Sequence, residues 1–72
     1  MNTKIHKKFG ERLKFLRKDK GLTQERLAEK VNVHPTYIGK IEGGKSNPSL
    51  LMIYKIAKAL DVQISEIFNF DI

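Results

Sequence analysis

The stretch at residues 23–42, TQERLAEKVNVHPTYIGKIE, constrains the fold of this chain more than any other segment. Thr23 is a favourable N-cap for a helix, because its hydroxyl can accept a bond from an amide of the first turn. Leu27 and Val31 recur at the four-residue spacing that places side chains on one helical face. Asn32 tolerates the left-handed backbone conformation and is therefore a good candidate to end this helix. The pattern predicts one short helix over this half of the stretch.

A second short helix is predicted after a break at residues 32–34. His34 precedes a proline and is therefore disfavoured in a helix, whereas Pro35 suits a first turn, where its missing amide proton is not needed. Ile38 and Ile41 are the inward positions of this second helix. Its outer face presents Pro35, Thr36, Tyr37, Gly39 and Lys40. Two short helices joined by a tight turn, with a polar outer face on the second, form the pattern of a helix-turn-helix.

The rest of the chain shows only helical periodicity, which predicts an all-α fold with five helices. The first helix is expected at about residues 3–19, and the fourth at residues 50–60 with Ser49 as its cap. A last short helix is expected at residues 66–68, with Ser65 as its cap. The expected inward residues are Ile5, Phe9, Leu13 and Leu16 in the first helix and Leu50, Ile53, Ile56, Ala57 and Leu60 in the fourth.

The length of 72 residues predicts a single domain, residues 1–72, with a small core. A domain of this size buries only about 60% of its unfolded surface, so dimerisation is an obvious source of further burial. There is no cysteine, which excludes disulfides and thiolate metal sites. The apolar runs are too short for a transmembrane helix, and the N-terminal residues lack the apolar core of a secretion signal. We therefore expect a cytoplasmic protein.

Positive charge is concentrated at the start of the chain. Residues 1–20 carry eight Lys or Arg against two acids, a net +6, whereas residues 21–72 carry six of each. A basic balance fits a nucleic-acid partner, an anionic membrane surface or solubility alone. The helix-turn-helix pattern in the same chain favours DNA.

The residues do not predict an enzyme. His6 and His34 lack the partner spacing of a zinc site, and neither belongs to a pairing of nucleophile and base. The pair Gly43-Gly44 follows a predicted helix rather than a strand, so it is expected to end the third helix and not to cradle a phosphate. The acids are scattered along the chain. We expect no catalytic residue, metal ion, cofactor or small-molecule ligand.

The run TQERLAEKVNVHPTYIGKIEGGKSNPS resembles the helix-turn-helix of the Xre/lambdoid-repressor (Cro/C1-type) family of bacterial and phage DNA-binding regulators. The residues that carry the likeness are Thr23-Gln24, Leu27-Ala28, Val33, Tyr37-Ile38, Ile41-Glu42 and Gly44-Lys45. It extends over residues 9–68. The segment TYIGKIEGGKSNPSL is also similar to the small controller proteins of restriction-modification systems, and to many unassigned regulators. The resemblance implies a lambda-repressor-like domain with the helix-turn-helix at helices 2 and 3.

The resemblance also implies a set of DNA-contacting residues. Gln24 matches a glutamine that bonds a phosphate in the family. Thr36 and Lys40 are expected to meet base edges in the major groove, and the loop after the third helix to reach phosphates. Tyr37 could contact DNA or act as an aromatic lid over the junction of the two helices. The predicted contacts are Gln24, His34, Pro35, Thr36, Tyr37, Lys40, Lys45, Ser46 and Asn47.

Two of these positions depart from the controller proteins. The controllers commonly carry arginine where this chain has Pro35 and Ser46. Arginine can read guanine bidentately, so both changes remove strong base readers. The operator of the controllers is therefore not expected to transfer to this chain.

The family pairs an arginine of the first helix with the acid that ends the third, and this chain has Arg17 and Glu42 at those positions. We expect a partly buried ion pair between them, the alternative being two exposed charges worth little.

The apolar residues toward the C-terminus exceed what a small core can hide. In the resembling proteins the C-terminal helices form a two-fold dimer, which would set two recognition helices about one DNA turn apart. We expect a dimerisation region at residues 62–72, joined by part of the fourth helix. The predicted interface residues are Met52, Tyr54, Ile64, Ile67, Phe68 and Phe70. The alternative is a C-terminal segment folded back over its own core.

The function that the sequence predicts is sequence-specific binding of double-stranded DNA by a homodimeric transcriptional regulator. A protein-interaction module, such as the antitoxin of a toxin-antitoxin pair, is the alternative. The absence of an evident toxin-binding tail in these 72 residues counts against it.

Overall fold

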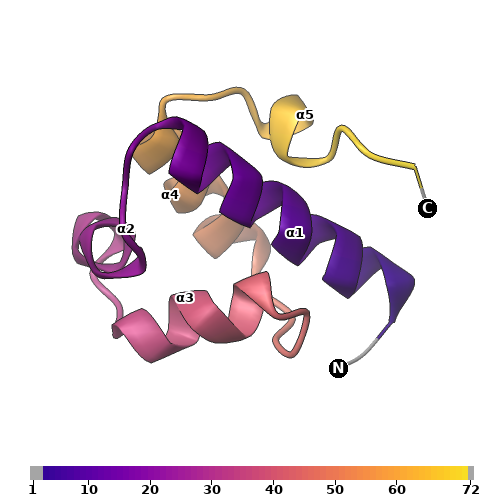
Figure 1. The fold of residues 1–72 in the computed structure, drawn as a ribbon, viewed down its shortest axis with the longest axis horizontal. Helices are drawn as coiled ribbons and strands as arrows, with labels where there is room; N and C mark the ends of the chain where they lie inside the picture. Colours follow the sequence, from indigo (N-terminus) through magenta and orange to yellow (C-terminus); the bar gives the residue numbers. More distant parts are fainter. Residues whose placement is uncertain (1–2, 72) are drawn as a thin grey trace.

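The computed structural model describes residues 3–71, and the predicted all-α fold with five helices is confirmed over that range. The helices are α1 (Lys4–Asp19), α2 (Gln24–Val31), α3 (Pro35–Glu42), α4 (Leu50–Leu60) and α5 (Ile64–Ile67). Helix α1 crosses the middle of the molecule, with α5 on one side of it and α3 on the other (Figure 1). Ile72, the last residue of the predicted C-terminal region, lies outside the described residues. No helix within residues 3–71 is long and apolar enough to cross a membrane.

Most helix boundaries follow from local cap chemistry. The hydroxyls of Thr23 and Ser49 each accept a bond from a backbone N–H of the first turn, as predicted for the starts of α2 and α4. The Thr3 hydroxyl caps α1 in the same way. Asn32 ends α2 in the left-handed conformation with φ +61°, also as predicted. Helix α4 ends at Leu60 as predicted, and Asp61 follows it in the same left-handed conformation with φ +57°, which was not predicted.

The prediction that Ser65 caps the last helix is wrong. Helix α5 begins two residues earlier than predicted, at Ile64, and Gln63 occupies the cap position. The backbone N–H of Gln63 donates to Glu66 Oε2 at 2.9 Å. An acid three residues after the cap forms half of a capping box, and this bond fixes the helix start ahead of Ser65.

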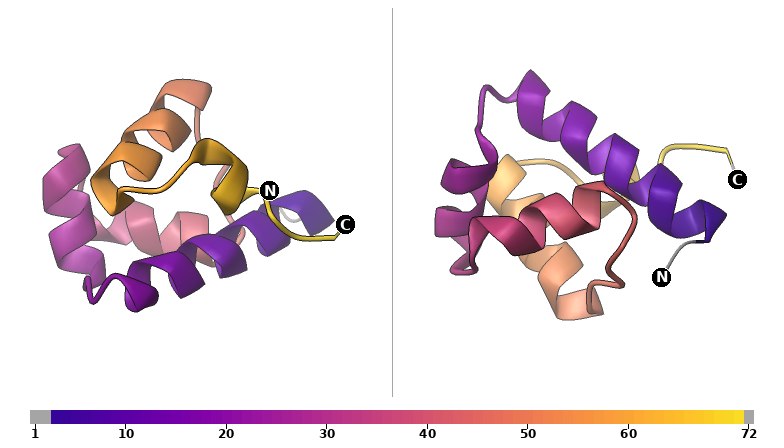
Figure 2. Two further views of the ribbon diagram at one scale, coloured as in Figure 1. Left: turned by 90° about the horizontal axis from the view of Figure 1, so that it is seen from above. Right: turned by 60° about the horizontal axis from the view of Figure 1, so that its bottom comes forward.

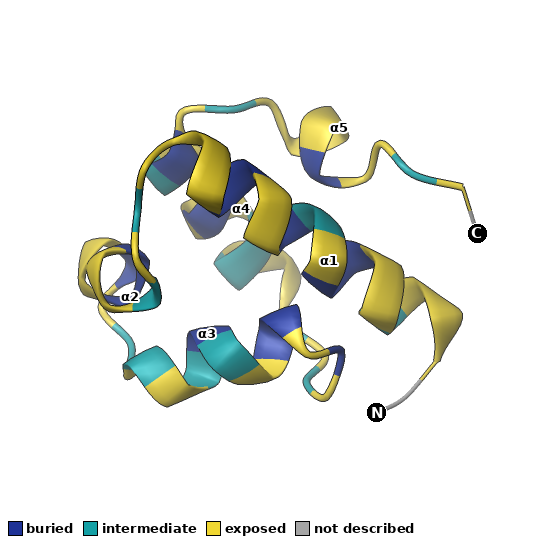
Figure 3. Ribbon diagram, in the orientation of Figure 1, coloured by how far each residue is buried: buried dark blue, intermediate teal, exposed yellow. Residues whose placement is uncertain are grey.

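The core lies where the five helices meet. Figure 3 shows buried stretches on all five helices beneath a largely exposed outer surface. The buried apolar side chains are Phe9, Leu13, Leu16, Leu27, Ala28, Val31, Ile38, Ile41, Ile56, Ala57, Leu60 and Ile67. Two residues predicted to point inward do not: Ile5 is 42% exposed and Leu50 is 78% exposed. Both lie in the first turn of a helix, where the helix extends beyond its neighbours, so periodicity alone overstates their burial.

Two glycines allow the backbone of α1 to approach the end of α3 closely. A Cβ atom at Gly10 would lie 2.4 Å from the carbonyl oxygen of Ile41 and 2.5 Å from that of Glu42. Gly44 has φ +74°, and a Cβ atom there would lie 2.9 Å from Lys7 Cα. The loop after α3 therefore lies directly against the first half of α1 (Figure 2, right). The glycine pair also ends α3 as predicted, since Gly43 is its C-terminal cap.

Candidate nucleic-acid interface

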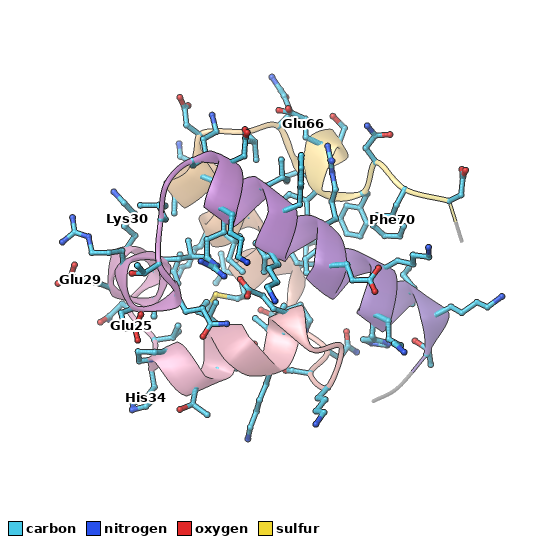
Figure 4. The ribbon with its side chains drawn as sticks, viewed as in Figure 1. Glu25, Glu29, Lys30, His34, Glu66 and Phe70 are labelled. Carbon is cyan, nitrogen blue, oxygen red and sulfur yellow. The ribbon has the colours of Figure 1, made fainter. Side chains whose placement is uncertain are left out.

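The outer face of α3 is fixed by the residues that bury its inner face. Ile38 and Ile41 are 0% and 1% exposed, which leaves Thr36 and Lys40 on the opposite, exposed side. The helix starts at Pro35, and the Nδ1 atom of the preceding residue, His34, accepts a bond from the N–H of Thr36 at 3.1 Å. Figure 4 shows His34 at the beginning of α3. His34 thus caps α3.

A shallow groove runs along α3 beside the first turn of α2. Its lining residues are Gln24, Glu25, Pro35, Thr36, Gly39, Lys40, Gly43 and Lys45. The groove brings together five of the predicted DNA contacts, from α2, α3 and the following loop. Gly39 forms its floor: a Cβ atom at Gly39 would lie 3.8 Å from the side-chain amide of Gln24, so that amide lies close over α3.

The other predicted contacts lie outside this groove. Ser46 is partly buried in the loop after α3. Asn47 lines a different, apolar hollow together with Ile5 and Phe9 of α1. Tyr37 is partly buried and packs against the core. The packing of Tyr37 resembles the aromatic lid that was the alternative to DNA contact.

Arg17 and Glu42 form a buried ion pair between α1 and α3. Their side chains are 7% and 3% exposed, and Arg17 Nε lies 2.6 Å from Glu42 Oε2. Arg17 also donates to Glu42 Oε1 at 3.2 Å and to the carbonyl oxygen of Leu22 at 2.7 Å. The pair is buried more deeply than the partly buried arrangement expected from sequence.

The same carboxylate also holds Gln24. The Gln24 Nε2 atom donates to Glu42 Oε1 at 2.9 Å, a contact that the sequence did not predict. The two residues are eighteen apart in the chain, and no local pattern connects them. A glutamine amide nitrogen carries two protons, so this bond leaves one proton for an acceptor outside the protein.

The prediction that Ile67 belongs to a dimer interface is wrong for the chain as it is folded. Ile67 is 0% exposed and is part of the core, because α5 packs against both α1 and α4. Met52 and Phe70 are partly buried against the same core. Figure 4 shows Phe70 beside α1. Much of the C-terminal segment therefore covers its own domain, as the alternative interpretation proposed.

Three of the predicted interface residues remain exposed: Tyr54 is 48%, Ile64 38% and Phe68 40% exposed. The Phe68 ring packs 5.2 Å from the Phe9 ring, centroid to centroid. Leu50 and Leu51 extend the exposed apolar surface of α4, at 78% and 59%. Among the described residues, no three His, Asp or Glu side chains are grouped so that they could hold a metal ion.

Comparisons with known proteins match this geometry to one family. The HTH_3 helix-turn-helix family matches residues 13–67. The control protein C.BamHI of Bacillus amyloliquefaciens is 41% identical over 71 residues, which cover 97% of this chain and 88% of C.BamHI. The immunity repressor protein of Bacillus phage phi105 is 45% identical over 58 residues, but the chain spans only 40% of its length.

A solved structure of a similar protein has the same fold as this chain. The restriction-modification controller protein C.AhdI from Aeromonas hydrophila superposes with a TM-score of 0.84 at 47% identity, covering 86% of this chain and 94% of that one. These relatives are named as regulators and control proteins rather than as enzymes. The predicted Xre-type resemblance is thus confirmed. The chain belongs to the HTH_3 helix-turn-helix family and is a transcriptional regulator of that type.

Proposed function

We propose that this protein is a cytoplasmic homodimer that binds a specific double-stranded DNA sequence, with α3 in the major groove. The observation that carries the proposal is the groove along α3, which exposed Thr36 and Lys40 line together with Gln24 and Lys45. The similarity to C.BamHI and C.AhdI supports a role in controlling restriction-modification genes.

Helix α3 suits the role of sequence reader. A helix with its side chains is about 10–12 Å across, and the major groove is about 12 Å wide. Thr36 and Lys40 are four residues apart and therefore lie on the same side of α3. A threonine can bond a base or contact a thymine methyl, and a lysine can donate to guanine.

Gln24 and Lys45 suit the role of phosphate anchors. Gln24 opens α2, where backbone amides and the helix dipole favour an anion. Lys45 lies in the loop beyond α3 and lines the same groove. Phosphate contacts from residues beside a reading helix fix its register on the duplex without reading bases.

The proposed base readers, Thr36 and Lys40, and the proposed phosphate anchors, Gln24 and Lys45, should respond differently to substitution. Thr36→Ala or Lys40→Ala is expected to cost roughly 1–3 kcal/mol on the preferred site and to relax preference at one base pair per half-site. Lys45→Ala is expected to weaken preferred and scrambled DNA alike and to lower the salt slope by about one per subunit. Gln24→Ala should weaken both without changing the slope, because glutamine carries no charge.

The measurement is fluorescence anisotropy with a duplex selected from random DNA and its scrambled counterpart, across a salt series. The docking proposed here is wrong if Lys45→Ala changes base preference while Thr36→Ala and Lys40→Ala leave it untouched. In that case the loop rather than α3 would read the sequence.

Exposed apolar surface on α4 and α5 supports the homodimer. These two helices and the cap of α5 carry five of the seven large hydrophobic side chains exposed within residues 3–71: Leu50, Leu51, Tyr54, Ile64 and Phe68. Clustered apolar surface of this kind marks interaction sites. A second copy of the chain would cover it and pair two α3 helices for adjacent half-sites.

Leu51→Glu is expected to raise the dimer dissociation constant at least about tenfold, because a charge at the interface must be desolvated. Leu51 is 59% exposed, so the change spares the core. Phe15→Glu is the control of matched exposure, since Phe15 is 58% exposed and belongs to α1. Analytical ultracentrifugation decides the matter: a wild-type chain that stays monomeric at tens of micromolar has no such dimer.

A further inference from the structure

The helix-turn-helix of this chain has no net charge. Residues 23–42 contain three basic and three acidic side chains, and residues 21–72 contain six of each. The whole net charge of +6 comes from residues 1–20, which form α1 and its flanks. Affinity for a duplex depends largely on cations that neutralise phosphates. Beyond Lys40 and the loop residue Lys45, the excess of cations available to neutralise phosphates therefore lies in α1 and its flanks, outside the helix-turn-helix.

One flank of α1 borders the groove of the candidate interface. The backbone of α1 at Lys7 lies against Gly44, the residue before Lys45 of the groove. Further along the same flank, Gly10 abuts the carbonyl of Glu42. The flank continues to Arg17, which pairs with the side chain of Glu42.

Lys14 belongs to this flank. It follows Gly10 by four residues and precedes Arg17 by three, the spacings that place residues side by side on a helix. Lys7 and Lys14 are both exposed, and seven residues separate them. They therefore form a short row of positive charge along the border between α1 and the end of α3.

We propose that α1 is part of the DNA interface and that Lys7 and Lys14 bind phosphates beside the major groove that α3 enters. This inference rests on the proposed function. A duplex carries one negative charge per about 1.7 Å of axis, so several phosphates fall within the roughly 10 Å between the two positions along α1. Binding to the backbone gives Lys7 and Lys14 a role in affinity and none in base preference.

The opposite flank of α1 provides a matched control. Lys8 is exposed, and its neighbour one turn on, Arg12, donates to the carbonyl oxygen of Glu66 in α5 at 2.8 Å. Lys8 thus lies toward α5, away from the groove. Removing Lys8 changes the net charge as much as removing Lys7 does. Comparing the two variants therefore distinguishes a local phosphate contact from the effect of total charge.

The test compares Lys7→Gln, Lys14→Gln and Lys8→Gln with the wild type. Glutamine keeps the first two methylene groups of lysine, including the Cγ atom beside Gly44, and replaces the charged end with a neutral amide. Binding is measured by anisotropy on the selected duplex and on scrambled duplex, across a salt series.

Lys7→Gln and Lys14→Gln are each expected to lower the salt slope by about one per subunit on both duplexes and to weaken binding about three- to tenfold at low salt. Lys8→Gln should leave the slope unchanged, and Lys7→Arg should restore it.

Equal slope changes for all three lysines would overturn the proposal, since total charge would then explain them. Unchanged slopes for Lys7→Gln and Lys14→Gln would overturn it as well, while base-preference changes in Thr36→Ala and Lys40→Ala would still support the proposed function. A wild-type chain that binds neither duplex would overturn both. Circular dichroism melts verify that each variant remains folded.

Discussion

Arg17→Ala is expected to remove about 3–5 kcal/mol of folding free energy, because it leaves the Glu42 carboxylate buried without a counter-charge. At roughly 0.05–0.15 kcal/mol per residue, a domain of 72 residues has about 4–11 kcal/mol of stability, so the variant should lose a large fraction of it. The reason is burial: both side chains are less than a tenth exposed, and Arg17 bonds Glu42 through two nitrogens. Urea denaturation followed by circular dichroism measures the loss.

Arg26→Ala is the control for this prediction. The Arg26–Glu29 pair lies on α2 with its side chains 66% and 72% exposed, at 3.4 Å. An exposed pair contributes about 0–1 kcal/mol, so its loss should be small. An Arg17→Ala variant as stable as Arg26→Ala would show that the buried pair is not needed for folding.

Gly10→Ala is expected to destabilise the domain by about 3 kcal/mol, at the upper end of the usual cost of overpacking or above it. The added methyl would meet the backbone carbonyls of Ile41 and Glu42 at 2.4–2.5 Å, and backbone atoms cannot move aside as a flexible side chain can. Helices α1 and α3 would have to separate. Helix propensity alone predicts the opposite sign, since alanine stabilises a helix interior by roughly 0.5–1 kcal/mol relative to glycine.

Gly39→Ala is the control for Gly10→Ala. Gly39 also lies inside a helix, but a Cβ atom there would meet only the Gln24 amide, at an ordinary 3.8 Å. Its substitution should therefore follow propensity and raise the melting temperature. If thermal melts show Gly10→Ala to be equally stabilising, the close approach of α1 to α3 is not as tight as described.

The sequence predicted the features that depend on neighbours along the chain. Thr23 and Ser49 cap their helices, and Asn32 ends α2, through bonds within three or four residues. Pro35 opens α3 for the same local reason. These signals need no knowledge of the fold, and together they were enough to predict five helices and a helix-turn-helix.

Features that depend on residues far apart in sequence were missed or misplaced. The role of Gly10 arises only when α1 crosses the end of α3, and the bond between Gln24 and Glu42 spans two helices. Ile67 looked like surplus apolar surface because periodicity cannot show that α5 folds back onto α1. The sequence could name the groove residues by resemblance, but their assembly into one surface is a consequence of packing.

The inner side of α3 packs in the core, and its outer side is exposed. Ile38, Ile41 and Glu42 hold the helix in place from within, while Thr36 and Lys40 contact neither the core nor the ion pair. Substitution of Thr36 or Lys40 therefore has little effect on the free energy of unfolding. Surface substitutions away from the core and from buried ion pairs usually change it by no more than about 0.5 kcal/mol. Over evolutionary time this separation lets descendants of one stable domain acquire new DNA targets by changing a few side chains. The expected result is a set of related domains that share this core and bind different operators.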